Sequence, residues 1–169
     1  MMDNAQHLDR LEQLTIVNNF INRNIHFASD MEIWGQEDYW STPLELLQKG
    51  AGDCEDFAIA KYIALRKLGI PDEQLRLIYV RAQLGAPDNP VVQAHMVLGY
   101  YEHPTDTPLI LDNLVGTLQP ATKRTDLSPV FSFNSQGLWV GGNRSSSADP
   151  TSRLSHWRDV LQRIHKDGL

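Results

Sequence analysis

Three residues of types that cooperate in nucleophilic catalysis occur along the chain in the order Cys54, His95 and Asp112. Cys54 is the only cysteine, and it stands where a glycine-rich turn leads into the helical run 57–68. The unpaired N–H groups of a helix start favour a thiolate over a thiol. This order predicts a thiol hydrolase or acyltransferase. Cys54 is then the nucleophile, His95 the base and later the acid, and Asp112 the residue that orients the imidazole.

His95 and Asp112 fall in two consecutive runs with strand character, 91–98 and 109–114. Side chains alternate between the two faces of a strand, so we expect Asp112 to share a face with His95. The opposite face of the first run is fully apolar. We expect the imidazole to project from the sheet toward the helix that begins at Cys54.

Acidic residues flank the thiol on both sides, at Asp53, Glu55 and Asp56. They stabilise a helix start, with Asp53 as the N-cap, but they also oppose a thiolate. A like charge about 6 Å away, at an effective dielectric near 40, raises a pKa by about one unit. A hard cation would remove this penalty, and Ca²⁺ accepts clustered carboxylate oxygens in irregular geometry. The cluster predicts a calcium site, to which Asp30 or Asp38 can add an oxygen.

Hydrophobic period and capping signals predict the helices that must position these groups. We expect helices over residues 8–21, 42–49, 54–68 and 154–164. Thr42 and Glu45 form a capping-box pattern around Pro43, and Gly50 ends that helix. Ser155 is the expected cap of the last helix.

From residue 75 onward the pattern changes to that of strands. We expect strands over 75–81, 91–98 and 109–114, and a closing hairpin of 129–134 and 137–140, with a turn at 85–90 and a polar loop at 141–152. Helices followed by strands predict an α+β fold, with N-terminal helices packed on an antiparallel sheet.

Length and composition limit the remaining possibilities. A chain of 169 residues with 41% hydrophobic residues suits a single domain over 1–169. A formal net charge of −6 argues against nucleic acid or an anionic membrane as the main partner. No apolar run is long enough to span a bilayer, and residues 1–10 hold no apolar signal core. The chain is therefore expected to be cytosolic, or to have lost a leader.

The sequence resembles the bacterial transglutaminase-like cysteine proteinases of the LapG type in five segments: 38–43, 50–62, 68–71, 94–98 and 111–113. The block around Cys54 is the most specific of them. The resemblance implies a papain-like or transglutaminase-like fold, and Cys54, His95 and Asp112 match the family triad. It also implies calcium dependence, with Asp53 and Glu55 in ligand positions and Asp56 as a further ligand.

The same resemblance implies a place in the cell and two partners. The enzyme is expected in the periplasm, which requires that a signal peptide was removed from this chain. Its expected substrate is a large cell-surface adhesin, cut near its N-terminus after a pair of alanines, which releases the adhesin and disperses biofilm. Its expected inhibitor is an inner-membrane cyclic-di-GMP receptor, which holds the protease through a periplasmic domain.

Two other functions stay open on the residues alone. A transglutaminase or deamidase would use the same triad on glutamine side chains. A non-catalytic calcium-binding module would bury Cys54 as an inert thiol. For a protease we expect the Cys54 N–H and a donor from the stretch 34–40 to hold the oxyanion. The aromatic residues Trp34, Tyr39 and Trp40 either narrow the cleft or pack as structural residues.

Overall fold

The computed structural model describes residues 8–85, 88–140 and 154–169. The predicted polar loop at 141–152 lies outside the described residues, as does the tip of the predicted turn at 86–87. Within the described part of the chain, each helix falls short of the length and apolar character that a bilayer span requires.

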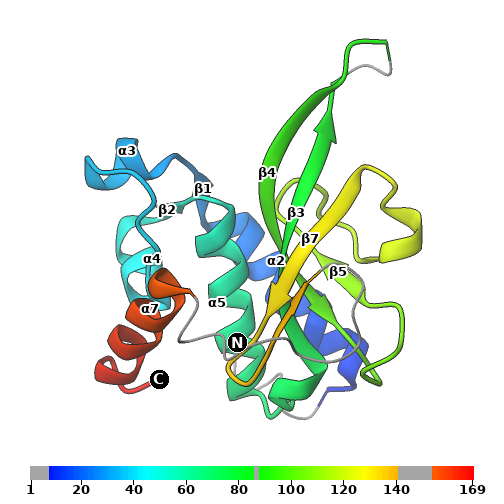
Figure 1. Ribbon diagram of the computed structural model, residues 1–169. Coiled ribbons are helices and arrows are strands. Elements are labelled where there is room, and N and C mark those ends of the chain that lie inside the picture. Colours follow the sequence, from blue (N-terminus) through cyan, green and yellow to red (C-terminus); the bar gives the residue numbers. More distant parts are fainter. Residues whose placement is uncertain (1–7, 86–87, 141–153) are drawn as a thin grey trace.

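A six-stranded antiparallel sheet forms one layer of the molecule (Figure 1). Its strands stand in the order β6-β5-β4-β3-β7-β8. Their bounds are β3 Leu75–Leu84, β4 Val91–Tyr100, β5 Leu109–Leu111, β6 Gln119–Pro120, β7 Leu127–Phe133 and β8 Leu138–Val140. The hairpin of β3 and β4 extends well beyond the body of the sheet (Figure 1).

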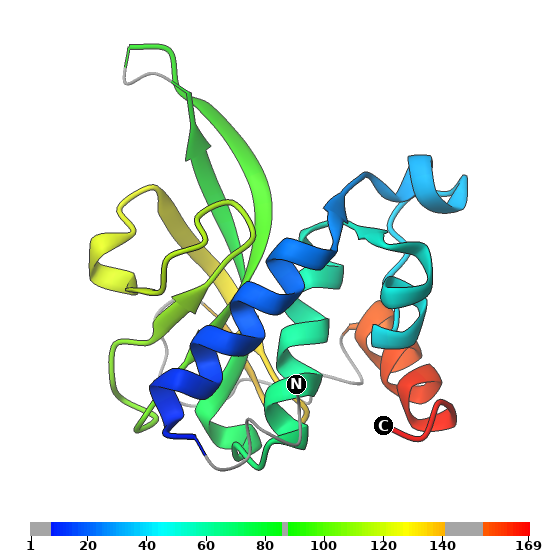
Figure 2. The ribbon, with the colours of Figure 1, turned by 180° about the vertical axis from the view of Figure 1, so that it is seen from behind.

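Helices cover one face of this sheet, and Figure 2 shows α2 lying across α5 on that side. The helical elements are α2 Arg10–Asn24, α3 Asp30–Trp34, α4 Pro43–Lys49, α5 Cys54–Lys67 and α7 Ser155–Lys166, with short 3₁₀ turns η1 Asp72–Gln74 and η2 Ala121–Lys123. Two short parallel strands, β1 His26–Phe27 and β2 Ala51–Gly52, tie the end of α2 to the start of α5. The predicted α+β class is therefore confirmed.

Alternation along the strands divides the apolar residues between two cores. The main core lies between the helices and the sheet, and includes Leu14, Val17, Ile59, Tyr62, Leu77, Met96, Leu98, Leu111 and Trp157. A second cluster, on the opposite face of the sheet, consists of Ile78, Val80, Val97, Tyr101 and Ile110. Successive residues of β3 and β4 point to opposite faces of the sheet. Apolar residues at consecutive positions are therefore buried in different clusters, one on each face.

The predicted helix starts of α4 and α5 are confirmed by their capping bonds. The Thr42 hydroxyl accepts the Glu45 N–H, and the Glu45 carboxylate accepts the Thr42 N–H, both at 3.2 Å. Gly50 ends α4 in the left-handed region at φ 67°, which costs a glycine little. The sequence was wrong about Ser155, which is the first helical residue of α7 and makes no capping bond there.

The strand predicted over 109–114 is shorter than expected, because β5 ends at Leu111. Asp112 follows it directly, and its Oδ1 accepts the Leu114 N–H at 3.0 Å. A side chain that captures a backbone N–H two residues on replaces the sheet ladder with a turn. Asp112 therefore stands at the end of the strand rather than inside it.

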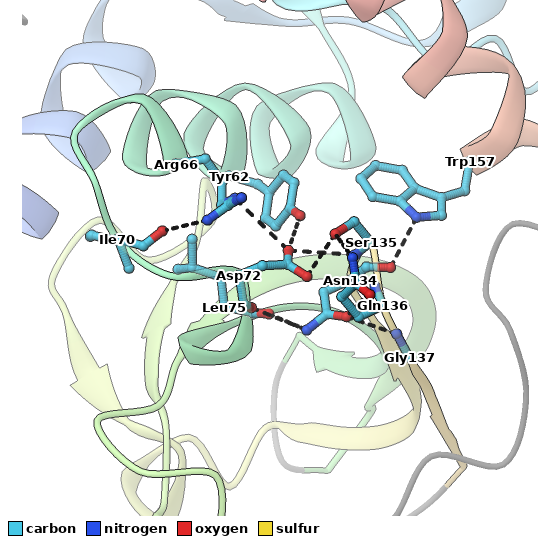
Figure 3. Close-up of polar contacts among 10 residues, drawn as sticks. All are labelled: Tyr62, Arg66, Ile70, Asp72, Leu75, Asn134, Ser135, Gln136, Gly137 and Trp157. Carbon is cyan, nitrogen blue, oxygen red and sulfur yellow. Dashed lines mark hydrogen bonds and ion pairs between the residues drawn. The ribbon is translucent and has the colours of Figure 1, made fainter.

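A buried polar cluster joins the end of α5, η1 and the turn between β7 and β8 (Figure 3). Asp72 accepts hydrogen bonds from the hydroxyls of Tyr62 and Ser135. The side-chain amide of Asn134 donates to the carbonyl oxygens of Asp72 and Leu75, both at 3.1 Å. These bonds fix the hairpin against the helix that carries Cys54.

Asn134 also fixes α7, and its substitution tests the cluster. Its Oδ1 accepts hydrogen bonds from the N–H groups of Gln136 and Gly137 at 2.9 Å, and its backbone carbonyl accepts one from Nε1 of Trp157 at 3.1 Å.

Asn134→Ala removes four side-chain hydrogen bonds at a residue that is 1% exposed. We expect it to lower the free energy of unfolding by about 2–4 kcal/mol. Urea denaturation measures this, and Gln136→Ala, at an exposed side chain, should change it by less than about 0.5 kcal/mol.

Candidate active site

The start of α5 places Cys54 at the first residue of the helix. Asp53 is the N-cap as predicted: its Oδ1 accepts the Asp56 N–H at 3.4 Å, and Asp56 Oδ2 accepts the Asp53 N–H at 3.0 Å. A Cβ on Gly52 would lie 2.4 Å from Cδ1 of Leu46 and 2.9 Å from Cβ of Asp56. Only glycine therefore lets the chain enter this helix in that position.

The thiol of Cys54 lies against β4 at Met96, the residue that follows His95 in the sequence. Strand β5 pairs with β4 only at residues 98–100, so the edge of β4 beyond this point has no partner from β5. The Met96 N–H forms a hydrogen bond to Sγ of Cys54 there. The nucleophile therefore lies beside the peptide unit that links His95 to Met96.

His95 is buried against a chain of charged groups, which runs from Asp112 through Arg124 to Asp126. Its Nε2 lies 2.7 Å from Oδ1 of Asp112, and both residues are at most 2% exposed. Nη2 of Arg124 donates to the other oxygen of Asp112 at 2.8 Å. Arg124 is held in turn by the two oxygens of Asp126, at 3.1 and 2.9 Å. The structure brings His95 and Asp112 together as the sequence predicted, and Nδ1 is the ring nitrogen that Asp112 does not use.

The backbone of β4 places His95 on a different face of the strand from Met96 and Leu98. Met96 and Leu98 pack in the main core against α5, whereas Val97 belongs to the second cluster. His95 alternates with Met96 and so leaves β4 on the side of Val97. The apolar face packs against the helix because its burial is favourable, and the thiol meets β4 through the backbone.

Asp112 is held in its charged form. Burial alone would raise its pKa, but the hydrogen bond and charge of His95, the Leu114 N–H and Arg124 together keep the pKa below its usual range. Lys61 of α5 is buried close enough to feel the charge of Asp112, and burial lowers the pKa of its ammonium to about 7. A carboxylate fixed in this way stabilises an imidazolium at His95.

The surroundings of Cys54 favour the neutral thiol. Burial, and then the charges of Glu55 and Asp53, raise the pKa of the thiol far above its usual value. Sγ lies 3.3 Å from Oε2 of Glu55 and donates to it. The opposition between thiolate and carboxylates that the sequence predicted is therefore present.

A cluster of carboxylates beside the thiol can hold a cation. Asp30, Asp53 and Asp56 each place an oxygen within 4.8 Å of the others. Burial raises the pKa of all three carboxyl groups, and repulsion from neighbouring carboxylates raises it further. The pKa of Asp56 is raised to about 6. Oδ1 of Asp30 is buried without a hydrogen-bond partner among the described residues. Glu55 is close enough to form a hydrogen bond with Asp53. The donor set is all oxygen, which suits a hard divalent cation.

The stretch 34–40 and the residue after it orient this cluster. The Tyr39 N–H donates to Asp30 at 2.7 Å, and the Ser41 N–H donates to Asp56 at 2.8 Å. Trp40 is 9% exposed and packs in the main core. This stretch thus holds carboxylates, and its Trp40 packs as a structural residue.

Substitution of Glu55 tests the electrostatic account of the thiol. Glu55→Gln removes the adjacent charge, and we expect alkylation of Cys54 by iodoacetamide in EGTA at pH 7 to become about tenfold faster, because one pKa unit is removed. Glu73→Gln, at an exposed position beyond the other end of α5, should leave the rate unchanged. Equal rates in Glu55→Gln and the parent protein would contradict the account.

Sequence reasoning missed Arg124, Asp126 and Lys61, and it named Asp30 only as an optional ligand. Arg124 follows η2, far from any recognised motif, and its role appears only when the loop returns to Asp112. Lys61 carries one usable signal, since a lysine on the apolar face of a helix is unusual.

A helix-start thiol, packed on an antiparallel sheet beside a buried histidine–carboxylate pair, defines a papain-like or transglutaminase-like thiol hydrolase. Comparison with known families assigns the protein within this class. The family model described as bacterial transglutaminase-like cysteine proteinase, BTLCP, matches residues 2–136. The chain belongs to this family and is a cysteine endopeptidase by that membership.

Solved structures give the same assignment. LapG of Legionella pneumophila in an EGTA-treated form has a TM-score of 0.83 and 40% sequence identity, over 96% of this chain and 83% of that one. Its calcium-bound form has a TM-score of 0.82 and 41% identity, over 96% and 84%. A search of curated proteins returned no match.

Proposed function

We propose that this protein hydrolyses peptide bonds through a thioester on Cys54. Sγ attacks the substrate carbonyl carbon as its proton passes to His95. His95 then protonates the leaving amine as the C–N bond breaks. Water that gives a proton to His95 attacks the thioester, which releases the new carboxylate and restores the thiol. The buried pair of His95 and Asp112, beside the thiol at the start of α5, is the observation that carries this proposal.

Asp112, Arg124 and the start of α5 each have a role in these steps. Asp112 orients the ring through Nε2, so that Nδ1 serves the thiol and the leaving amine. Arg124 fixes the second oxygen of Asp112 and keeps the carboxylate ionised. The N–H of Cys54 at the helix start is the expected first donor to the oxyanion.

We propose that Asp30, Asp53 and Asp56 bind Ca²⁺, and that Glu55 turns toward it from the thiol. When bound, the ion supplies positive charge that offsets the carboxylates beside Cys54. The raised pKa values, the unpartnered oxygen of Asp30 and the calcium-bound form of the Legionella relative support this. The proposal adds Asp30 to the predicted ligands Asp53, Glu55 and Asp56.

We further propose a biological role from the family resemblance. The protein acts in the periplasm on a large surface adhesin, cuts it near the N-terminus after a pair of alanines, and so releases it and disperses biofilm. A periplasmic domain of an inner-membrane cyclic-di-GMP receptor holds the protease inactive. Family membership and the likeness to LapG support this role.

The test is cleavage of an N-terminal fragment of the cognate adhesin, in calcium and in excess EGTA. Cys54→Ala is the matched control for chemistry, and a fragment with the two alanines changed to leucine is the control for the site. We expect two fragments in calcium only, none with Cys54→Ala and none from the altered substrate. The receptor's periplasmic domain, added in excess, should stop the reaction.

Other outcomes would redirect the assignment. An intact substrate whose mass rises by conversion of glutamine to glutamate would indicate a deamidase. Equal cleavage in EGTA would overturn calcium dependence and leave the protease standing. If the substrate stays intact and unmodified although the protein is folded, the remaining reading is a non-catalytic calcium-binding module. Slow alkylation of Cys54 by iodoacetamide would then support that reading.

A further inference from the structure

The hairpin of β3 and β4 is covered by a neighbouring strand on one edge and is open on the other. Strand β7 pairs with β3 over residues 77–82, and the Gln83 N–H donates to the carbonyl oxygen of Asp126 at 2.7 Å. On the other edge, β5 pairs with β4 only over residues 98–100. No strand in the described part of the chain covers that edge over residues 91–97. Figure 1 shows this end of the hairpin extending beyond the sheet.

The open edge of β4 has none of the usual protection against strand pairing. Native proteins shield an exposed edge with lysines, prolines, bulges or very short strands. The outermost strands of this sheet are short, because β6 has two residues and β8 has three. The open edge instead carries Val91, Val92, Gln93 and Ala94, which are uncharged and exposed, with Val92 at 64%. Such an edge is suited to pairing with another extended chain.

The backbone of this edge lies in line with the thiol. Successive residues of a strand direct their N–H and carbonyl groups to opposite edges, so residues 92, 94 and 96 share one edge. The Met96 N–H bonds to Sγ of Cys54, and β5 pairs on the same side. The N–H and carbonyl groups of Val92 and Ala94 therefore face away from β3. At about 3.4 Å per residue, Ala94 lies about 7 Å from Met96 along the strand.

We propose that the substrate binds as an added β-strand along the open edge of β4. Its backbone pairs with Val92 and Ala94, which brings a neighbouring peptide group of the substrate to the thiol of Cys54. This inference rests on the proposed peptidase function and deepens it by naming the conformation in which the substrate is recognised. The edge offers backbone groups and uncharged side chains, so it selects an extended segment without proline rather than a charged one.

The test uses decapeptides centred on the alanine pair of the cognate adhesin, each with one backbone N–H methylated. In an added strand, alternate N–H groups point toward β4 and away from it. We expect methylation to weaken binding to the Cys54→Ala protein about tenfold at alternate positions and less than about twofold between them, because only one set loses a hydrogen bond. Calorimetry measures the dissociation constants, and cleavage by the parent protein is followed in parallel.

Two proline variants test the same edge from the side of the protein. Val92→Pro removes an N–H that faces the open edge and not β3, and proline is tolerated on edge strands, so we expect the hairpin to stay folded. It should weaken binding of the unmethylated peptide about tenfold. Asp88→Pro, in the exposed turn of the same hairpin, should leave binding unchanged. The peptide series keeps the test valid if Val92→Pro does not fold.

The outcomes separate this inference from the peptidase function. Equal weakening at every methylated position, or equal binding by Val92→Pro and Asp88→Pro, would overturn the added strand even if the adhesin is cut. Failure of the unmethylated peptide to bind would overturn it as well. A dimer in sedimentation that Val92→Pro dissociates would mean that the edge pairs with a second copy of this chain instead. Alternating binding without cleavage would support the added strand and count against the peptidase.

Discussion

Asp112→Asn is expected to lower kcat about 10³–10⁴-fold while the protein stays folded. The amide has nearly the size of the carboxylate but no charge, so it neither stabilises an imidazolium at His95 nor selects the correct ring tautomer. Steady-state cleavage of the adhesin fragment measures the loss. Circular dichroism and the thermal midpoint check the fold.

Asp126→Asn is the matched control for this substitution. Asp126 contacts Arg124 but not His95, and its side chain is 36% exposed. We expect a loss of less than about tenfold, because the charge beside the imidazole is intact. A similar loss in both variants would show that the whole chain of charges acts as one structural unit. A loss of less than tenfold in Asp112→Asn would exclude Asp112 from the triad.

Arg124→Met is expected to have the largest effect on stability, a loss of about 3–5 kcal/mol in the free energy of unfolding. The variant removes a side chain that is 3% exposed and leaves Asp112 buried without its cation. Urea denaturation at pH 7 measures the loss. Lys123→Met, at the exposed neighbouring position, should stay within about 0.5 kcal/mol of the parent protein.

The loss in Arg124→Met should also depend on pH with a definite sign. The pKa of Asp112 is lower in the folded protein than in the unfolded chain, so its contribution to stability is present above the unfolded pKa. That contribution is lost as pH falls through the folded pKa. The difference between parent and variant should therefore be largest at neutral pH and shrink below about pH 4. A difference that does not change with pH would mean that Arg124 acts through packing alone.

Local signals in the sequence located the starts of α4 and α5 and the pairing of His95 with Asp112. Thr42 and Asp53 cap helices through bonds that span three residues, so short-range pattern is sufficient to find them. His95 and Asp112 were predicted to share a face, and they do, because alternation holds along each strand. The length of β5 was overestimated, because Asp112 uses its own carboxylate to end the strand.

The rest depends on contacts between residues that are distant in sequence. Arg124 meets Asp112 only because η2 folds back over the end of β5, and no period or spacing encodes that return. Asp30 reaches the carboxylate cluster because β1 pairs with β2, which brings α3 to the start of α5. A strand pattern likewise does not say which face of β4 the helix α5 will cover, and the packing of Met96 and Leu98 decides this only in the folded chain.

Asp53 has two structural duties, and this affects how any variant at that position can be interpreted. It caps the helix that carries Cys54, and it is also one of the clustered carboxylates. A loss of activity in Asp53→Ala could therefore come from a frayed start of α5 or from a weakened cation site, and the activity alone would not distinguish them. Asp30 caps nothing on α5 and reaches the cluster from a different segment, so titration of calcium against Asp30→Asn isolates the metal from the helix.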